Sequence, residues 1–359
     1  MNHYKVLFLL VFSLVVFTPQ TQAAMTYGAT TATSDGNYTL DGITSSAFSF
    51  GPSITTGSIV MGSGLTSGTI TIGGASQSGN IILGPTGATS KIGIGTSSPR
   101  TRLELGNDGA VLAIGTYGSG WTEPNLGAGT RMIWYPRKAA FRVGNISGTK
   151  WNNVNIGNYS IAMGSDTTAS ADYSTAMGDV TTASGDASTA MGSSTTASAD
   201  YSTAMGSSTT ASGISSVAMG ESTQAAGNNS VAMGLATATG SYASVAMGKY
   251  NVGGGTAGSW VATEALFEIG IGTDYGNKAN ALTVLKNGNV GIGTATPGAS
   301  NLLDLTSTTK GFVLPRMTKA QRDAIATPVA GMMIYQTDNT PGLRVYNATN
   351  WMRFTETAD

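Results

Sequence analysis

The residues that could do acid, base or nucleophile chemistry are few in this 359-residue chain. The one histidine is His3, and cysteine is absent. Catalytic triads, cysteine nucleophiles and histidine-ligated zinc each need one of these residue types. Carboxylate chemistry passes this test, because a glycosidase works with two paired acids, but no acid pair stands apart from the repeats described below. The sequence therefore predicts no enzyme: no catalytic, cofactor-binding or metal-binding residues, and no cofactor.

Paired glycines could indicate a nucleotide-binding loop. Three Gly-x-Gly pairs occur, at Gly93/Gly95, Gly270/Gly272 and Gly291/Gly293. The nucleotide fingerprint also needs a third glycine and an amphipathic helix, and neither follows these pairs. We interpret them as turn glycines.

Three aspartates, Asp172, Asp186 and Asp200, recur at equal intervals along the sequence. Stacked carboxylates could hold a cation such as Ca²⁺. One oxygen donor per repeat is sparse, however, and the spacing differs from that of the nonapeptide calcium roll. We favour solvated turn aspartates. The segment from Trp151 to Gly248 has six acids and neither Lys nor Arg, so it should favour basic partners, weakly at physiological salt.

The segment from Arg131 to Lys150 holds five basic residues and no acid, with Trp134, Tyr135 and Phe141 among them. Interleaved basic and aromatic residues can bind nucleic acid or glycans. The alternative is a compact β junction that leads into the repeats. The chain has a net charge of only −1, which provides no steering toward nucleic acid. We favour the junction and expect no nucleic-acid partner.

Threonine pairs at 167/168, 181/182, 195/196 and 209/210 would form stacked ladders. A regular threonine face could bind ice or a crystalline polymer. Ordinary β propensity explains the same residues.

Sequence repeats must position all of these residues. A Met-Gly pair recurs with a constant 14-residue period, without insertion. Its methionines are Met163, Met177, Met191, Met205, Met219, Met233 and Met247. The Ser, Thr, Val and Gly around them suit strands and turns better than helices.

Each repeat predicts two short strands, Ser-(Ile/Thr/Val)-Ala-Met and Thr-Thr-Ala-Ser. Gly164 and its equivalents should end the first strand. Gly185-Asp186 or Gly227-Asn228 should form the second corner, because these residues accept positive φ. One repeat is then one coil of a β-solenoid, whose coils pair in parallel at ~4.8 Å.

Side-chain alternation places the methionine and the third residue of each coil on one face. The intervening Ser and Ala lie on the opposite face, where small side chains let another surface approach closely. One large apolar side chain per coil buries little area. We therefore expect several chains to share a core of methionine and β-branched side chains.

The Ser-(Val/Thr)-Ala-Met-Gly motif at this spacing resembles the YadA-like head repeats of trimeric autotransporter adhesins and related haemagglutinin-type proteins. The resemblance covers residues 157–250. It implies a left-handed parallel β-roll, assembly of three identical chains, and binding to host or matrix surfaces. It supplies no catalytic residues.

The flanks repeat on other periods. Within 24–90, short glycine-bounded β runs recur with an 11-residue period, at 57–62, 68–73 and 79–84. KIGIGTSSPRTRLEL (91–105) and NVGIGTATPGASNLLDL (289–305) share a motif, with a partial copy at 267–273. These segments resemble modules of bacterial surface proteins and phage tail-fibre-like proteins. We expect a β module and junction over 91–156 and a β connector over 251–305.

The last segment, 306–359, predicts a small α+β cap for the solenoid end. Thr318 and Gln321 form a capping box for a short helix that ends near Ala326. Residues 332–336 and 343–346 then predict a hairpin, and Trp351 is expected to help seal the cap.

Residues 1–23 have the layout of a secretory signal peptide, with Lys5, an apolar run from Val6 to Phe17 and a small-x-small cleavage site before Ala24. The 12-residue run is short for a membrane span, which needs ~20 residues. We find neither a heptad stalk nor a series of barrel strands. We therefore expect export, no transmembrane anchor of the chain's own, and a place outside the cell or attached to its surface.

Three functions follow, in order of preference. The first is a homotrimeric adhesin-like head that binds a protein or glycan ligand. The second is a structural fibre or spacer of an appendage or tail-fibre-like assembly. The third is a carbohydrate-active spike.

Overall fold

The computed structural model describes residues 30–32, 38–40, 92–94, 99–106, 110–123 and 125–354. The chain divides into two compact units, Met1–Gly109 and Ala110–Asp359. The predicted signal peptide over 1–23 and the 11-residue repeats within 57–84 lie outside the described residues.

The first unit contains two small strand pairs. Strand β1 (Thr30–Ala32) pairs antiparallel with β2 (Tyr38–Leu40). Strand β3 (Ile92–Ile94) pairs in parallel with β4 (Leu103–Leu105).

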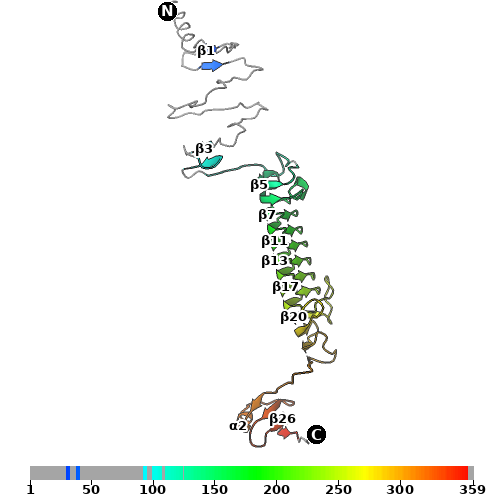
Figure 1. The fold of residues 1–359 in the computed structure, drawn as a ribbon. Helices are drawn as coiled ribbons and strands as arrows, with labels where there is room; N and C mark the ends of the chain where they lie inside the picture. Colours follow the sequence, from blue (N-terminus) through cyan, green and yellow to red (C-terminus); the bar gives the residue numbers. More distant parts are fainter. Residues whose placement is uncertain are drawn as a thin grey trace, which may run out of the picture. The chain divides into compact units, whose positions relative to one another are not determined.

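The second unit contains a parallel β-solenoid, which confirms the predicted all-β fold class. Each coil has one long and one short strand, and successive coils pair in parallel in a 14-residue register such as Met191↔Met205 (Figure 1). The long strands are β7 (Ile161–Ser165), β9 (Thr175–Asp179), β11 (Thr189–Ser193), β13 (Thr203–Ser207), β15 (Val217–Glu221), β17 (Val231–Leu235) and β19 (Val245–Lys249). The short strands are β8 (Thr168–Ala169), β10 (Thr182–Ala183), β12 (Thr196–Ala197), β14 (Thr210–Ala211), β16 (Gln224–Ala225) and β18 (Ala238–Thr239).

The long-strand sheet continues beyond the repeats at both ends, to 13 strands in all. Before the repeats lie β5 (Gly129–Tyr135), the 3₁₀ turn η1 (Pro136–Lys138), β6 (Ala140–Ile146) and the 3₁₀ turn η2 (Asn153–Asn155). After them lie β20 (Ala265–Ile271), β21 (Asn280–Leu285), β22 (Val290–Ile292) and β23 (Leu303–Leu305). The hairpin β5–β6 pairs with the first coil, and β20 pairs with the last.

Small residues fill the interior of each coil. Ala190 and Ala197 are 0% exposed, as are Ser188 and Thr195. We predicted that the small Ser and Ala side chains let another surface approach closely. That surface is the opposite wall of the same coil. The methionines do not line this interior; they lie half-buried on the outer face of the long-strand sheet. Their packing between chains, as the shared core that we predict, stays a prediction.

Several coil corners need positive φ at residues that the sequence does not mark. At the second corner the left-handed residue is Ala187, with φ 52°, and not the Gly185-Asp186 pair that we predicted. The other corner passes through residues such as Val180, with φ 53°. In-register hydrogen bonds to the previous coil, such as Ala187 N–H to Asp172 O at 2.8 Å, hold these conformations in place.

Gly164 and its equivalents lie inside the long strands, so our prediction that they end the strands is wrong. Gly192 has φ +121°, and a Cβ added there would lie 2.0 Å from the carbonyl oxygen of Gly206. Each of these glycines faces its counterpart in the next coil. The position requires glycine because of its backbone conformation and because of the close approach of the next coil.

Replacing Gly192 with alanine should therefore destabilise the solenoid by more than about 2 kcal/mol, because it adds both a left-handed strain and a backbone clash. Ser193→Ala is the matched control, since Ser193 is exposed on the same strand. Urea unfolding of both variants measures the difference. Equal stability of the two would contradict the close approach.

The C-terminal residues form a separate four-stranded sheet. It consists of β24 (Arg316–Met317), β25 (Met333–Gln336), β26 (Gly342–Tyr346) and β27 (Trp351–Arg353), with helix α2 (Lys319–Asp323) between β24 and β25. The predicted capping box is present, with Thr318 as N-cap and Gln321 at the third helical position. The predicted hairpin is β25–β26.

Trp351 packs within this sheet. Its ring lies 5.3 Å from that of Tyr346 and 5.7 Å from the guanidinium carbon of Arg322. The covering of a solenoid end by this segment stays a prediction.

Candidate binding surfaces of the solenoid

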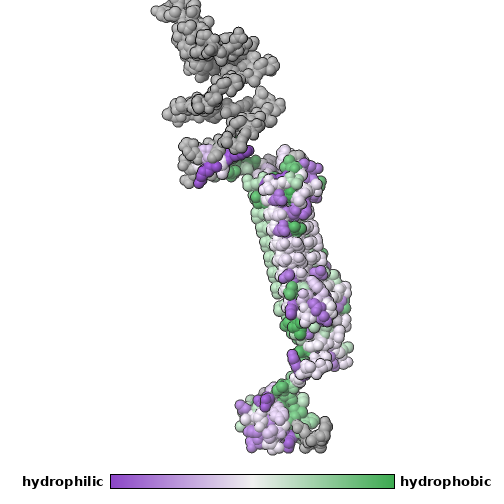
Figure 2. Space-filling view, in the orientation of Figure 1, coloured by the Kyte–Doolittle hydropathy of each residue, from purple (hydrophilic) through white to green (hydrophobic). Residues whose placement is uncertain are grey.

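The outer face of the long-strand sheet carries two columns of mostly apolar side chains. One column contains the methionines, and the register continues it to Val143 at one end and Ile269 at the other. The second column contains the Ile, Thr or Val at the third position, continued by Phe141 and Phe267. A hydrophobic strip runs along one side of the head, beside β7 to β17 (Figure 2). We call these two columns the outer strip.

A buried arginine closes one end of the column of interior alanines. Arg142 is paired in register with Ala162, so its side chain takes the place of an interior alanine. The guanidinium is 0% exposed and donates hydrogen bonds to Ser160 O and Ala169 O, both at 2.9 Å. Burial lowers the pKa of Arg142 to about 10.

A buried glutamate closes the other end of the same column. Glu268 is paired with Ala246 and is 5% exposed. Its carboxylate accepts hydrogen bonds from the side-chain amides of Asn251, at 2.5 Å, and Asn280, at 2.7 Å. Trp151 lies at the start of the interior threonine column, where its Nε1 donates to Thr167 O at 2.9 Å.

We did not predict either of these buried charged residues from the sequence, although a signal was present. Phe-Arg-Val-Gly (141–144) and Phe-Glu-Ile-Gly (267–270) have the pattern of Ile-Ala-Met-Gly (161–164), with a charge in place of alanine. Aligning the three segments on their glycines places Arg142 and Glu268 in the same column as the alanines.

The threonine pairs do not form a double face. Thr195 is buried in the coil, whereas its neighbour Thr196 is half-exposed on a short strand. Only one threonine of each pair is outside because neighbouring residues of a strand point to opposite faces. The outer threonine column also stops at Gln224, which occupies that position in the fifth coil.

The aspartate corners hold the backbone of the previous coil. Asp172 accepts hydrogen bonds from the backbone N–H of Asn158, at 2.9 Å, and from its Nδ2. Asp200 accepts from the N–H of Asp186 at 3.0 Å. In the part of the chain that the structure describes, no three His, Cys, Asp or Glu residues come together as a metal site.

Tyrosine rings stack along the same corner as these aspartates. Tyr117 lies over Tyr159 at 4.9 Å between ring centroids, and Tyr159 lies over Tyr173 at 5.0 Å, with interplanar angles of 20° and 11°. Tyr173 and Tyr201 are 62% and 66% exposed. The head therefore presents aromatic rings next to carboxylates.

The basic segment 131–150 forms the β5–β6 hairpin and the chain that leads into the first coil. Its basic side chains bind backbone carbonyls: Lys138 Nζ donates to Asn153 O at 2.7 Å, and Lys150 Nζ donates to Asp166 O at 3.0 Å. This arrangement is that of the compact junction that we favoured.

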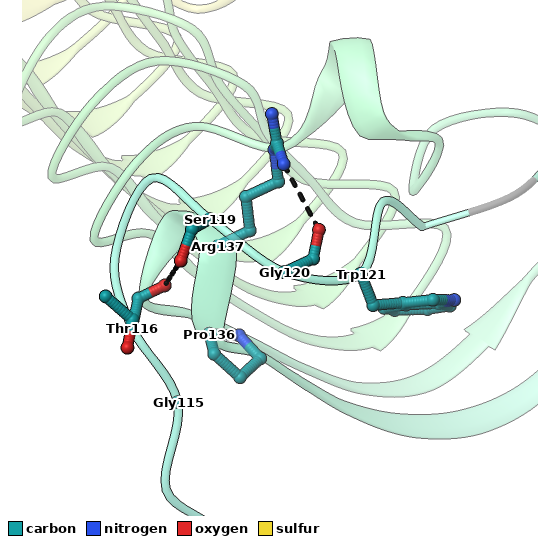
Figure 3. A pocket seen from close by; sticks show the side chains of 7 residues that line it. All are labelled: Gly115, Thr116, Ser119, Gly120, Trp121, Pro136 and Arg137. Carbon is teal, nitrogen blue, oxygen red and sulfur yellow. Dashed lines mark hydrogen bonds between the residues drawn. The ribbon is translucent and has the colours of Figure 1, made fainter. Parts of the chain in front are cut away.

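A shallow pocket lies beside this hairpin, between the loop Gly115–Trp121 and the residues Pro136 and Arg137 (Figure 3). Arg137 Nη1 donates to Gly120 O at 3.2 Å, so part of the guanidinium's donor capacity is used to hold the loop. The ring of Trp121 contacts Tyr135 edge-on at 5.7 Å.

Two family descriptions match parts of the chain. The YadA head domain repeat matches residues 156–179, 183–209 and 211–237. The chain contains a YadA-like head. A phage tail-like trimerisation region matches residues 291–359, so the head has a tail-fibre-like flank. Both resemblances that the sequence suggested are confirmed. No curated protein and no solved structure matches the chain.

The helices of the described residues include none with the length and apolar character needed to cross a membrane.

Replacing Arg142 with methionine should destabilise the YadA-like head by about 1–3 kcal/mol, because buried carbonyls would lose their donors. Arg131→Met is the control, since Arg131 donates to Gly127 O in an exposed contact of the same hairpin. Denaturant unfolding compares the two. An Arg142 variant as stable as the control would show that the buried hydrogen bonds of Arg142 contribute nothing to stability.

The head should also lose stability in acid through Asp172. Hydrogen bonds from the Asn158 side chain, then from its backbone, hold the pKa of Asp172 below its usual range. The charge therefore stabilises the fold above the ordinary aspartate pKa of about 4, and this contribution is lost as the pH falls through the lower folded-state pKa. Asp172→Asn should reduce the drop in Tm between pH 7 and pH 3. Asp179→Asn, on an exposed position of β9, is the control, and an equal reduction in both variants would contradict the assignment.

Proposed function

We propose that the protein is an exported, non-enzymatic homotrimer that works as an adhesin-like head at or beyond the cell surface. The outer strip is the observation that carries this proposal. Its side chains are half-buried in one chain, except Ile161, which is exposed. Its methionines are larger than the interior alanines and more apolar than the interior serines and threonines. A second and third copy would remove this surface from water, and the trimerisation-region match at 291–359 supports the number three.

The non-enzymatic role is supported by composition. Outside the predicted signal peptide the chain has neither histidine nor cysteine. The aspartates Asp172 and Asp200 accept hydrogen bonds from the backbone, which is a structural use.

The adhesive role is supported by the head repeats and by the corners they present. Stacked tyrosines and carboxylates lie on corners beside the outer strip, at positions that can vary from coil to coil without disturbing the interior. Surfaces that combine exposed aromatic rings with polar groups are suited to protein or glycan recognition.

A structural fibre is the second candidate, and the phage tail-like region favours it. In this role the head is a rod that spaces other components, and its corners have no ligand.

The trimer is tested by substitution on the outer strip. Met205→Asp should yield a monomer, because it places three charges in the shared apolar core, whereas Ser207→Asp on the exposed end of the same strand should leave the trimer intact. Light scattering after size exclusion gives the mass. A wild-type protein that is a folded monomer would contradict the proposed trimer.

The adhesive role is tested separately on the intact trimer. Binding to immobilised matrix proteins, to glycan arrays or to cells is expected of an adhesin. A trimer that binds none of these surfaces would contradict the adhesive role and favour the structural fibre.

A further inference from the structure

The column of tyrosines lacks one ring. Tyr159, Tyr173 and Tyr201 occupy the second corner of their coils, with φ of 56°, 58° and 59°. Ala187, with φ 52°, occupies the same corner in the coil between Tyr173 and Tyr201. The backbone is therefore continuous past this point, and only a ring is missing.

The missing ring leaves room for one flat group. Tyr159 and Tyr173 stack at 5.0 Å, so two coil steps place Tyr173 and Tyr201 about 10 Å apart. A flat group midway between them lies about 5 Å from each ring, within the ~6 Å reach of a cation–π contact. Both rings are more than half exposed. We call the space over Ala187 the ring gap.

The charge around the ring gap favours a cation. Asp172, Asp186 and Asp200 directly precede the three corner residues that bound it. The backbone N–H of Asp186 is bound to Asp200, but its own carboxylate is exposed and makes no hydrogen bond among the described residues. Residues 151–248 include six acids and no Lys or Arg, so the cation must come from elsewhere.

A guanidinium meets both requirements. It is planar, stacks on aromatic faces and donates in a fork that matches a carboxylate. An ammonium is compact and strongly hydrated, so it uses the two ring faces less well. A sugar ring can stack but gains nothing from the negative charge.

We propose that the ring gap between Tyr173 and Tyr201 binds an arginine side chain of a partner protein, with Asp186 as its ion-pair partner. This inference rests on the binding role proposed for the head and names the chemistry of its partner. A trimer has three such gaps, so individually weak contacts add through avidity.

The test uses the full mature protein on arginine-agarose and on lysine-agarose at the same ligand density and salt. The wild type should be retained more strongly on arginine. Ala187→Tyr fills the gap with the residue found in the neighbouring coils, and should reduce arginine retention by roughly two- to fivefold. Ser215→Tyr is the matched control, because it adds a ring at the same corner one coil beyond Tyr201 and leaves the gap open.

Two further variants keep the test decisive. Asp186→Asn should weaken arginine retention and leave lysine retention closer to that of the wild type. Tyr201→Ser, which copies the residue of the next coil, opens the gap on one side and should act like Ala187→Tyr even if that variant folds poorly.

Equal wild-type retention on the two matrices would overturn the proposal, because charge alone would explain binding. Full retention of Ala187→Tyr would also overturn it, as would selective retention on a neutral sugar matrix. The outcome is distinct from that for the adhesive role. If the trimer binds cells equally well with and without Ala187→Tyr, the adhesive role stands and the arginine site is contradicted. If the protein is retained selectively on arginine but binds no surface, the arginine site stands and the adhesive role is contradicted.

Discussion

Each coil lies directly on its predecessor, in register, and this stacking constrains every other feature. A residue's nearest neighbour across the sheet is its own counterpart in the next coil, as in Gly192↔Gly206. The residue at each position of the coil must therefore be able to stack on its counterparts in the neighbouring coils. Glycine meets this condition where the backbones of two coils nearly touch. Alanine and threonine meet it inside the coil, where the two strands face each other. Methionine meets it on the outer face of the long-strand sheet, which is open.

The sequence predicts the period, the strands and the two faces, but not which face is inside. Alternation separates Ala190 from Met191 without saying which of them the coil encloses. Volume decides it: the two strands of a 14-residue coil lie too close for methionine between them, so alanine is inside. The left-handed corner at Ala187 was also unpredictable, since alanine carries no preference for that conformation, and hydrogen bonds to the previous coil impose it. Gly185, which does carry the preference, is used for close packing.

The interior ends show why a stack needs special residues where it stops. Coils inside the stack satisfy one another's backbone groups, but the first and last coils have an open side. Arg142 has the length and the several donors to reach Ser160 O and Ala169 O together. Glu268 does the converse at the other end, where amide groups from Asn251 and Asn280 converge on it. Aligned motifs could have revealed both residues, but only after the interior position was known.

An interior built from Ala, Ser and Thr has a consequence for how the fold is stabilised. These side chains release little apolar area from water. Several buried threonine hydroxyls, including those of Thr181 and Thr195, have no hydrogen-bond partner among the described residues. The backbone ladder defines the shape, but the larger apolar area lies outside, on the outer strip. Stability gained by covering that strip depends on association, so it varies with protein concentration. A chain without cysteine cannot replace that contribution by crosslinks. In the trimer that we propose, folding of the head would therefore be coupled to assembly of its subunits. Corner residues such as Tyr173 and Asp186 lie off the strip and outside the interior, so they can change with little effect on either.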